Sequence, residues 1–375
     1  MIVRNCRLID MAGKWEESCD VEIRNGIFGR IGKDLPADGQ EIFDANGRIV
    51  TPGFVDPHCM VGVRSQVFRF ERNDADETTG PLQPQMRAID AINLMDEGFA
   101  MLRSGGVTTA VTGPGTENLI GGTFAAIKTG GKGFSQRIVC EEIAYHFVLT
   151  NEPRQQYGKK GKSPATRMGS AALIREELMR AKLYRERSKS ENKPMFDLGM
   201  ESLMRVFDGM LVKFTAVSQT DIRTAVRIAE EFGLNYTVDV AYDALIMAEE
   251  LKAHGTRCVI GSLYGGGVSA DTRQRCLENG AVLEKSGLTY ALMSGHPALN
   301  GELVPAYLAL LHKYGMSRRA ALEGMTIRAA EAIDLSARVG SIETGKDADL
   351  LVWSGDPLDY YSEIDLMLIN GVKVK

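Results

Sequence analysis

The sequence predicts an α/β protein, a (β/α)8 barrel of the TIM type with a small β-sandwich domain built from both termini. Two observations point to this fold. The middle of the chain alternates β-branched apolar runs with amphipathic helical patterns, which is typical of a parallel sheet covered by helices. The two ends carry short strands and tight turns instead. A length of 375 residues suits one barrel with one smaller domain.

The small β domain is predicted from matching strand patterns at the two ends of the chain. Asn25-Gly26 and Asn370-Gly371 are dipeptides that favour two-residue hairpin turns. The expected strands are Met1–Leu8, Asp20–Arg24, Arg48–Thr51, Ala348–Trp353 and Leu366–Val374. We therefore assign residues 1–51 and 336–375 to this domain and residues 52–335 to the barrel.

The barrel is predicted from strand-like runs that are separated by helical patterns. The runs are Gly106–Thr112, Arg137–Ala144, Leu211–Val217, Asn235–Ala241, Arg257–Gly261 and Leu288–Ser294. The helical patterns are Ala171–Arg187, Asp221–Phe232 and Ala244–His254. An open, doubly wound sheet is the alternative, but no Gly-x-Gly-x-x-Gly motif follows the first strand, which disfavours a dinucleotide-binding protein.

Composition excludes several classes of partner. A net charge of −5 argues against a nucleic-acid surface, which needs clustered excess lysine and arginine. No apolar run reaches the ~20 residues that a membrane span needs, and Arg4, Arg7 and Asp10 interrupt the first apolar run. The six cysteines are spaced singly, as in reduced intracellular proteins. We expect a cytoplasmic protein.

The segment Thr51–Met60 carries the most informative motif of the chain. It reads Thr-Pro-Gly-Phe-Val-Asp-Pro-His-Cys-Met, and alternation along a strand places Asp56, His58 and Met60 on one face. The motif resembles the Pro-Gly-Phe/Leu-Ile/Val-Asp-x-His-x-His strand that opens the barrel of the amidohydrolase superfamily. Its second histidine is replaced by Met60, and a thioether does not replace an imidazole on zinc or manganese.

Further motifs extend the resemblance over nearly the whole chain. They are Gly340–Leu350, Val107–Thr109, Thr112–Gly115, Ile120–Gly122 and Ser294–Pro297. Together they resemble a bacterial branch related to imidazolonepropionase and dihydroorotase-like enzymes. The resemblance implies a barrel hydrolase of C–N bonds in amides or cyclic imides. Such enzymes use one or two divalent metals, which activate a bound water.

The metal-ligand positions that the resemblance implies are mostly substituted. Of the first-strand pair, only His58 remains. The strand-five histidines correspond to Thr215 and Val217, the strand-six histidine to Val240, and the strand-eight aspartate to Gly295. For the bridging group, Lys128 and either Glu141 or Glu142 are candidates. The expected pocket residues are His58, Met60, Lys128, Thr215, Val217, Val240, Gly295 and His296.

The histidine count limits any metal centre without reference to an alignment. The chain has five histidines, and two of them, His254 and His312, lie in helical patterns that should face away from a barrel mouth. Three histidines cannot build a four-histidine binuclear site. We expect no metal; the candidate ligands for Zn or Mn are His58 and His146. Candidate catalytic residues are His296 and Asp239, although Asp239 is equally explained as a structural carboxylate.

Three polar loops are candidates for ligand recognition, because loops at the strand ends carry specificity in barrels. They are Arg64–Pro84, the basic segment Asn151–Arg167 and the glycine-rich segment Gly261–Gly267. The last two could hold an anion, or be ordinary surface loops.

Three functions remain open from the sequence. The first is a degenerate amidohydrolase that binds a small molecule or accompanies an active relative. The second is an active hydrolase with a rebuilt mononuclear site, since three protein ligands suffice for catalytic zinc. The third is a metal-free acid–base catalyst in the same pocket. By analogy with the fold we expect a homo-oligomer, with neither nucleic acid nor a membrane as partner.

Overall fold

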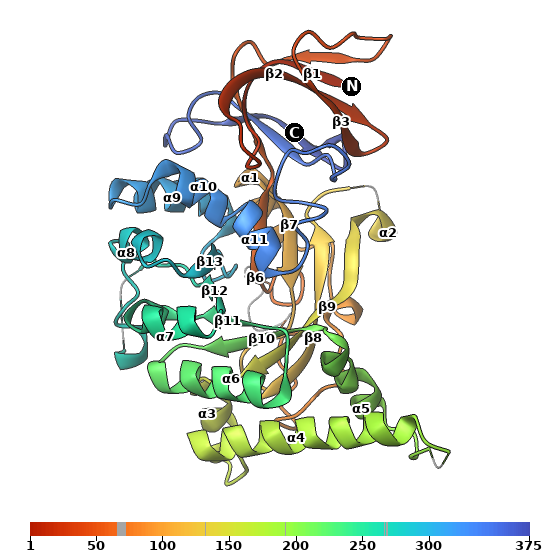
Figure 1. Ribbon diagram of the computed structural model, residues 1–375, viewed down its shortest axis with the longest axis vertical. Helices are drawn as coiled ribbons and strands as arrows, with labels where there is room; N and C mark the ends of the chain where they lie inside the picture. Colours follow the sequence, from red (N-terminus) through yellow and green to blue (C-terminus); the bar gives the residue numbers. More distant parts are fainter. Residues whose placement is uncertain (66–72, 132, 192, 266, 268) are drawn as a thin grey trace.

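The computed structural model describes residues 1–65, 73–131, 133–191, 193–265, 267 and 269–375. Parts of two predicted recognition loops, residues 66–72 and 266, therefore lie outside the described residues. The described strands form two sheets of eight strands each. One sheet combines both termini at one end of the molecule, and the other forms the wall of the barrel (Figure 1).

The terminal sheet joins strands from the two ends of the chain in the order β16-β15-β14-β5-β1-β2-β3, with β4 beside β1. Its strands are β1 Ile2–Ile9, β2 Trp15–Arg24, β3 Ile27–Gly32, β4 Ile42–Asp44, β5 Ile49–Pro52, β14 Leu350–Trp353, β15 Ile364–Ile369 and β16 Val372–Lys373. The sandwich arrangement and the domain boundaries stay predictions.

The two Asn-Gly turns form as predicted and hold the termini together. Asn25 and Gly26 have φ of 54° and 81°, and Asn370 and Gly371 have φ of 49° and 70°, as a type I′ turn requires. Ala348 bridges the two turns, because its N–H donates to the Gly26 carbonyl and its carbonyl accepts from the Gly371 N–H, both at 2.8 Å.

The barrel sheet runs in the order β13-β12-β11-β10-β9-β8-β7-β6. Its strands are β6 Phe54–Cys59, β7 Val107–Thr112, β8 Ile120–Lys128, β9 Ile138–Val148, β10 Leu211–Ala216, β11 Tyr236–Val240, β12 Arg257–Ile260 and β13 Thr289–Leu292. The ends of the sheet approach each other, because Met60 N–H donates to the His296 carbonyl at 2.8 Å. The predicted barrel is thus confirmed as a nearly closed eight-stranded sheet.

One strand departs from the parallel pattern that a (β/α)8 barrel predicts. Strand β8 runs antiparallel to both β7 and β9. The reason is the length of its connections. Residues 113–119 lead from β7 to β8, too few for the dozen or more that a helical crossover between parallel strands needs.

Helices cover the outside of the barrel (Figure 1). They are α1 Gly98–Ser104, α2 Phe134–Arg137, α3 Glu152–Gly158, α4 Arg167–Ser188, α5 Leu198–Leu203, α6 Gln219–Phe232, α7 Ala248–Ala253, α8 Asn279–Lys285, α9 Val304–Lys313, α10 Arg318–Gly324 and α11 Ile327–Ala332. The predicted helix Ala244–His254 is a 3-10 turn, Tyr242–Met247, followed by α7. None of the described helices combines the length and apolar character that crossing a membrane requires.

Gly53 explains part of the Pro-Gly-Phe motif at the passage from the terminal sheet to the barrel. A Cβ atom on Gly53 would lie 2.2 Å from Oγ1 of Thr108 on β7, so no larger residue fits there. The close approach carries the chain from β5 directly into β6, whose last residues include His58.

Candidate functional site

A buried ion-paired group lies inside the barrel where β6, β10 and β11 end. The ammonium group of Lys213 is 2.7 Å from Oδ2 of Asp239, and the same oxygen is 2.6 Å from Nδ1 of His58. Register explains the first contact: Thr215 pairs with Asp239, so Lys213 lies diagonally across from it on the neighbouring strand. Lys213 and Asp239 are fully buried, where an unpaired charge would be very costly.

The electrostatics of this group fix the protonation of His58. Burial alone would raise the pKa of Asp239, but Lys213 and His58 outweigh burial and hold that pKa below its ordinary value. Burial lowers the pKa of His58, against the opposing effect of Asp239. His58 is therefore neutral at pH 7, and its Nδ1–H donates to the Asp239 carboxylate. No described residue makes a hydrogen bond with the remaining ring nitrogen, Nε2.

His146 on β9 lies next to this group but is engaged elsewhere. Its Nε2 is 2.8 Å from the hydroxyl oxygen of Thr215, and its ring packs 5.5 Å from that of His58 between centroids. Phe124 on β8 contacts both rings, at 4.8 Å and 5.0 Å. Burial lowers the pKa of His146 well below its ordinary value, so this ring is also neutral.

Asp56 links β6 to the segment that follows β13. The Ser294 hydroxyl donates to its carboxylate, and the N–H groups of Ser294 and His58 approach the other oxygen at 3.3 Å and 3.4 Å. Burial raises the pKa of Asp56 to about 6. Asp56 thus holds the end of β6 to the segment that follows β13, and this fixes the position of the His58 backbone.

A cavity of about 170 Å³ opens at this end of the barrel, with His58 in its wall. The other lining residues are Cys59, Met60, Pro114, Gly115, Thr116, Thr215, Val240, Tyr242, Ser262, Arg275, Met293, Ser294, Gly295 and Ala298. We call it the mouth cavity. Among the described residues, its lining contains hydroxyl groups, apolar side chains, one histidine and one arginine, but no carboxylate.

The structure brings most of the predicted pocket residues together at the mouth cavity. His58, Met60, Thr215, Val240 and Gly295 line it. Val240 has a φ of +68°, rare for a β-branched residue, directly after Asp239. Within the described part of the chain, no group of three or more His, Cys, Asp or Glu side chains could hold a metal ion.

Other predicted residues lie away from the cavity. Lys128 is at the opposite end of the barrel, 2.7 Å from Asp349 and 3.0 Å from Asp347. His296 is fully buried, with its Nε2 next to Gly98. Val217 packs against the core outside the lining.

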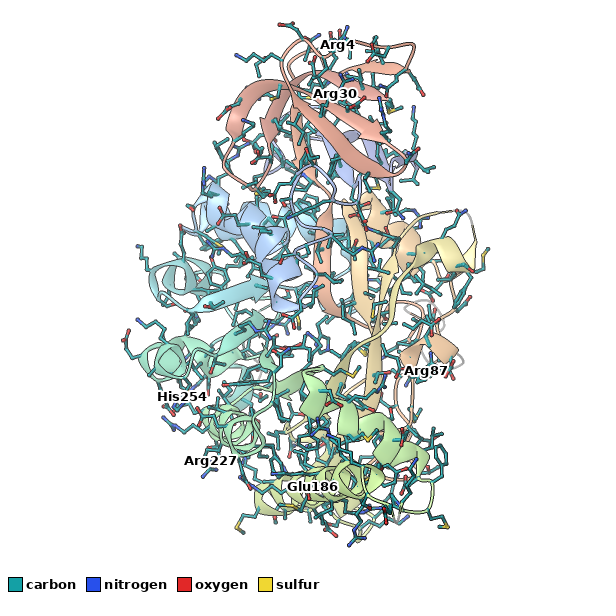
Figure 2. All side chains as sticks on the ribbon, turned by 45° about the vertical axis from the view of Figure 1, so that its right-hand side comes forward. Arg4, Arg30, Arg87, Glu186, Arg227 and His254 are labelled. Carbon is teal, nitrogen blue, oxygen red and sulfur yellow. The ribbon has the colours of Figure 1, made fainter. Side chains whose placement is uncertain are left out.

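His254 and His312 lie on the outer helices. His254 pairs with Glu230 at the surface (Figure 2), and His312 Nδ1 is 2.8 Å from the Met316 carbonyl oxygen. Of the basic segment Asn151–Arg167, the residues 152–158 form α3.

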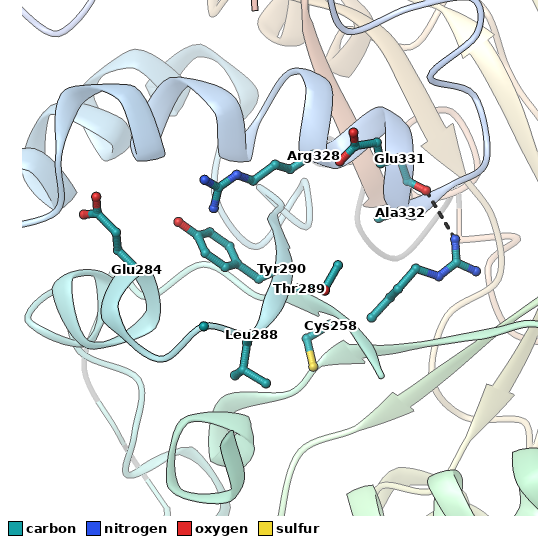
Figure 3. Close-up of a pocket in the computed structure, with 10 residues that line it drawn as sticks. Cys258, Glu284, Leu288, Thr289, Tyr290, Arg328, Glu331 and Ala332 are labelled. Carbon is teal, nitrogen blue, oxygen red and sulfur yellow. Dashed lines mark hydrogen bonds between the residues drawn. The ribbon is translucent and has the colours of Figure 1, made fainter. Parts of the chain in front are cut away.

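A larger cavity of about 320 Å³ opens at the other end of β12 and β13 (Figure 3). Most of its charged side chains already have partners. Arg257 pairs with Asp334 at 2.7 Å, Arg328 with Glu323 at 2.7 Å, and Glu284 accepts from the Ser317 N–H. Catalytic residues of barrels come from the opposite, C-terminal strand ends. We therefore place the candidate site at the mouth cavity.

Sequence reasoning missed two charged residues in or beside the mouth cavity. Lys213 stands inside an apolar strand, and a lysine there needs a buried acid nearby, which was a usable signal for its pairing with Asp239. Arg275 lies in the irregular segment after β12, where no periodicity indicates which side chains face inward. The predicted glycine-rich loop contributes Ser262 to the lining.

Comparisons with known proteins agree with the architecture. The amidohydrolase family matches residues 208–374. The solved structure of an amidohydrolase from Thermotoga maritima MSB8 is 31% identical, with a TM-score of 0.95 over 100% of this chain and 99% of that one. L-hydantoinase from Arthrobacter aurescens, at 16% identity and a TM-score of 0.56 over 100% and 95% of the two chains, shares the fold alone.

Two curated relatives align along most of the chain. The amidohydrolase tasK of Hapsidospora irregularis is 27% identical over 90% of this chain, which spans only 38% of that protein. The imidazolonepropionase of Symbiobacterium thermophilum is 27% identical over 84% of this chain and 76% of its own length. The full-length match to the Thermotoga structure, the barrel and the predicted motifs together show that this chain belongs to the amidohydrolase family.

Proposed function

We propose that this amidohydrolase-family protein binds a small molecule in the mouth cavity without the metal-dependent hydrolysis that its motifs imply. The observation that carries the proposal is the ion pair of Lys213 and Asp239 with His58. A divalent cation beside these residues would stand close to the Lys213 ammonium, which lies 2.7 Å from Oδ2 of the ionised Asp239. The two positive charges would compete for the same oxygen.

The side chains at the implied ligand positions support the same proposal. Met60 supplies a thioether, Thr215 a hydroxyl that already contacts His146, and Val240 no donor at all. The position of the strand-eight aspartate is Gly295, so it offers no carboxylate to activate a water. This donor set does not fit zinc or manganese, which bind imidazole and carboxylate.

A metal-free acid–base reaction is the second candidate function. Asp239 holds Nδ1 of His58, in the manner of the carboxylates that orient catalytic histidines, and leaves Nε2 free of described partners in the wall of the cavity. In this function His58 removes a proton from a bound substrate. Substituting such a base lowers the rate by about 10²–10⁴-fold.

Elemental analysis after dialysis against Zn and Mn tests the proposal. We expect less than about a tenth of an equivalent of either metal, because ligand sets this poor bind weakly. His254→Ala is the matched control, since this surface histidine should not alter any specific site. About one equivalent of metal that is retained in His254→Ala and lost in His58→Ala would overturn the proposal and establish the rebuilt mononuclear site.

A hydrolase screen separates the two candidate functions. Chelator-treated protein is incubated with amides and cyclic imides, and turnover is compared between wild type and His58→Gln. Ligand binding alone predicts no turnover in either protein. Chelator-resistant turnover that falls by about 10²-fold or more in His58→Gln establishes the acid–base function instead.

A further inference from the structure

Arg275 is a cation in the wall of the mouth cavity that has no acidic partner among the described residues. Its Nε donates to the Ser262 carbonyl at 3.0 Å, and no carboxylate among the described residues lies within ion-pair distance of its guanidinium. Gly265 lies directly against it, since a Cβ there would be 3.2 Å from Nη2. The guanidinium is thus anchored at one nitrogen, with donors remaining for a carboxylate, which it matches in shape.

His58 presents the opposite chemistry to the same cavity. With its Nδ1–H donated to Asp239, its Nε2 carries a lone pair and accepts a hydrogen bond. A carboxylate placed against this nitrogen would bring two acceptors together. An N–H or O–H group on the ligand satisfies Nε2 instead. His58 and Arg275, which both line the cavity, therefore require different groups of one ligand.

The size and remaining lining limit the ligand further. About 170 Å³ is below the ~300–1,000 Å³ of pockets for drug-sized ligands. Thioether, valine and alanine surfaces from Met60, Met293, Val240 and Ala298 offer room for a short apolar part. No acidic side chain of the lining opposes an anion.

We propose that the mouth cavity binds a small carboxylate that carries an N–H or O–H group, with the carboxylate on Arg275 and the donor on His58. This inference rests on the proposed ligand-binding function and adds its ligand class. Arg275 determines the preference for an anion, and His58 determines the preference for a hydrogen-bond donor.

Three matched probes test the assignment by isothermal titration calorimetry in the presence of a chelator. N-acetylglycine has both groups, N-acetylglycinamide lacks the carboxylate, and N-acetylsarcosine lacks the N–H. We expect N-acetylglycine to bind about 10- to 100-fold more tightly than either of the others, because the amide loses the bond to the charged Arg275 and the N-methyl compound leaves the buried His58 acceptor unsatisfied. Arg275→Gln should abolish the preference over the amide, and His58→Leu, which has no acceptor, the preference over the N-methyl compound.

Arg273→Gln is the control, because Arg273 is exposed two residues away and outside the lining. It should bind N-acetylglycine as wild type does, and thermal unfolding checks that each variant is folded. Equal affinity for N-acetylglycine and its amide, unchanged affinity in Arg275→Gln, or no binding of any probe overturns the ligand assignment. Binding that appears only with added metal overturns the proposed function instead.

Discussion

Two buried lysines of the barrel pair with carboxylates at opposite ends of the same sheet. Lys128 at the end of β8 contacts Asp349 at 2.7 Å, Asp347 at 3.0 Å and the Thr109 hydroxyl at 3.3 Å. Among the carboxylates of the described residues, Lys213 on β10 pairs with Asp239 alone, at 2.7 Å. Both side chains are almost completely buried, at 1% and 0% exposure. The chemistry is alike, but the surroundings differ.

We call the Lys128 cluster closed, because its charged groups are all bonded to one another or to neighbouring residues. Asp349 also accepts from the N–H of Asn370 in the terminal sheet, and Asp347 pairs with Arg338 at 3.0 Å. These bonds fasten the barrel to the terminal sheet, and none of the residues lines the mouth cavity. A satisfied network of this kind orders the structure but offers nothing to a ligand.

We call the Lys213 cluster open, because Nε2 of His58 has no hydrogen-bond partner among the described residues. Asp239 accepts a hydrogen bond from Nδ1 of His58, whose Nε2 is left for the mouth cavity. The difference shows that a buried ion pair is a functional candidate only when it leaves a polar atom facing a cavity. Burial and pairing alone do not separate the two ends of the barrel.

Replacing the closed lysine should have the largest effect on stability. Lys128→Met leaves Asp347 and Asp349 without their buried partner, and we expect a loss of about 3–5 kcal/mol in the free energy of unfolding. Chemical denaturation at pH 8 measures it. Lys182→Met on the exposed face of α4 is the control and should change stability by less than about 0.5 kcal/mol. A loss below about 1 kcal/mol for Lys128→Met would show that the Lys128 ion pairs do not stabilise the structure as predicted.

Replacing the open lysine should cost less, and the cost should depend on pH. In Lys213→Met, Asp239 keeps His58 and the Thr237 hydroxyl, so we expect a loss of about 2–3 kcal/mol at pH 8. Lys213 contributes to the lowered pKa of His58, so its removal raises that pKa. A raised histidine pKa adds stability at low pH that is lost as the pH rises through it.

Denaturation of Lys213→Met at pH 6 and pH 8 separates the two ends of the barrel. The loss should be about 1 kcal/mol smaller at pH 6, where His58 takes a proton and replaces the missing charge. The Lys213→Met, Asp239→Asn double variant removes the stranded carboxylate and should recover stability. If the loss in the free energy of unfolding is the same at both pH values and the double variant recovers no stability, the Lys213 cluster is as closed as the Lys128 cluster.

The sequence predicted the fold better than the site because the fold depends on repeated patterns. Alternating strands and helices and the paired Asn-Gly turns each occur more than once. Strand β8 was not among the predicted strands, because its Gly121-Gly122 and Ala125-Ala126 pairs lack the β-branched character of the other runs. The antiparallel direction of β8 follows from the lengths of the loops that connect it to its neighbours. These lengths are known only once every strand has been located.

The site depends on single residues whose roles are set by their partners. His58 was predicted from its motif, whereas Asp239 stayed ambiguous between pocket acid and structural carboxylate. The register of β10 and β11 decides that it meets both Lys213 and His58. Arg275 comes from an irregular segment, and no sequence pattern predicts which way such a side chain points.

His296, a buried histidine outside the lining of the mouth cavity, provides the last test of what faces the cavity. His296 is fully buried; its Nδ1 accepts from the Gly301 N–H at 3.2 Å, and its Nε2 has no hydrogen-bond partner among the described residues. Burial lowers its pKa to about 4. A lowered histidine pKa gives stability that is present above the unfolded value of about 6.5 and is lost as the pH falls towards the folded value.

Between pH 7 and pH 5, His296 should therefore reduce the free energy of unfolding of wild type by about 2 kcal/mol. The free energy of unfolding of His296→Gln should fall by about 2 kcal/mol less than that of wild type over the same range. His254→Gln, at the surface, should show the same pH dependence as wild type. Denaturation curves at the two pH values measure the difference. If His296→Gln instead shows the same pH slope as wild type, the ring takes up a proton freely in the folded state. His296 would then have to reach solvent through the mouth, and it would belong with His58 as a residue that meets the ligand.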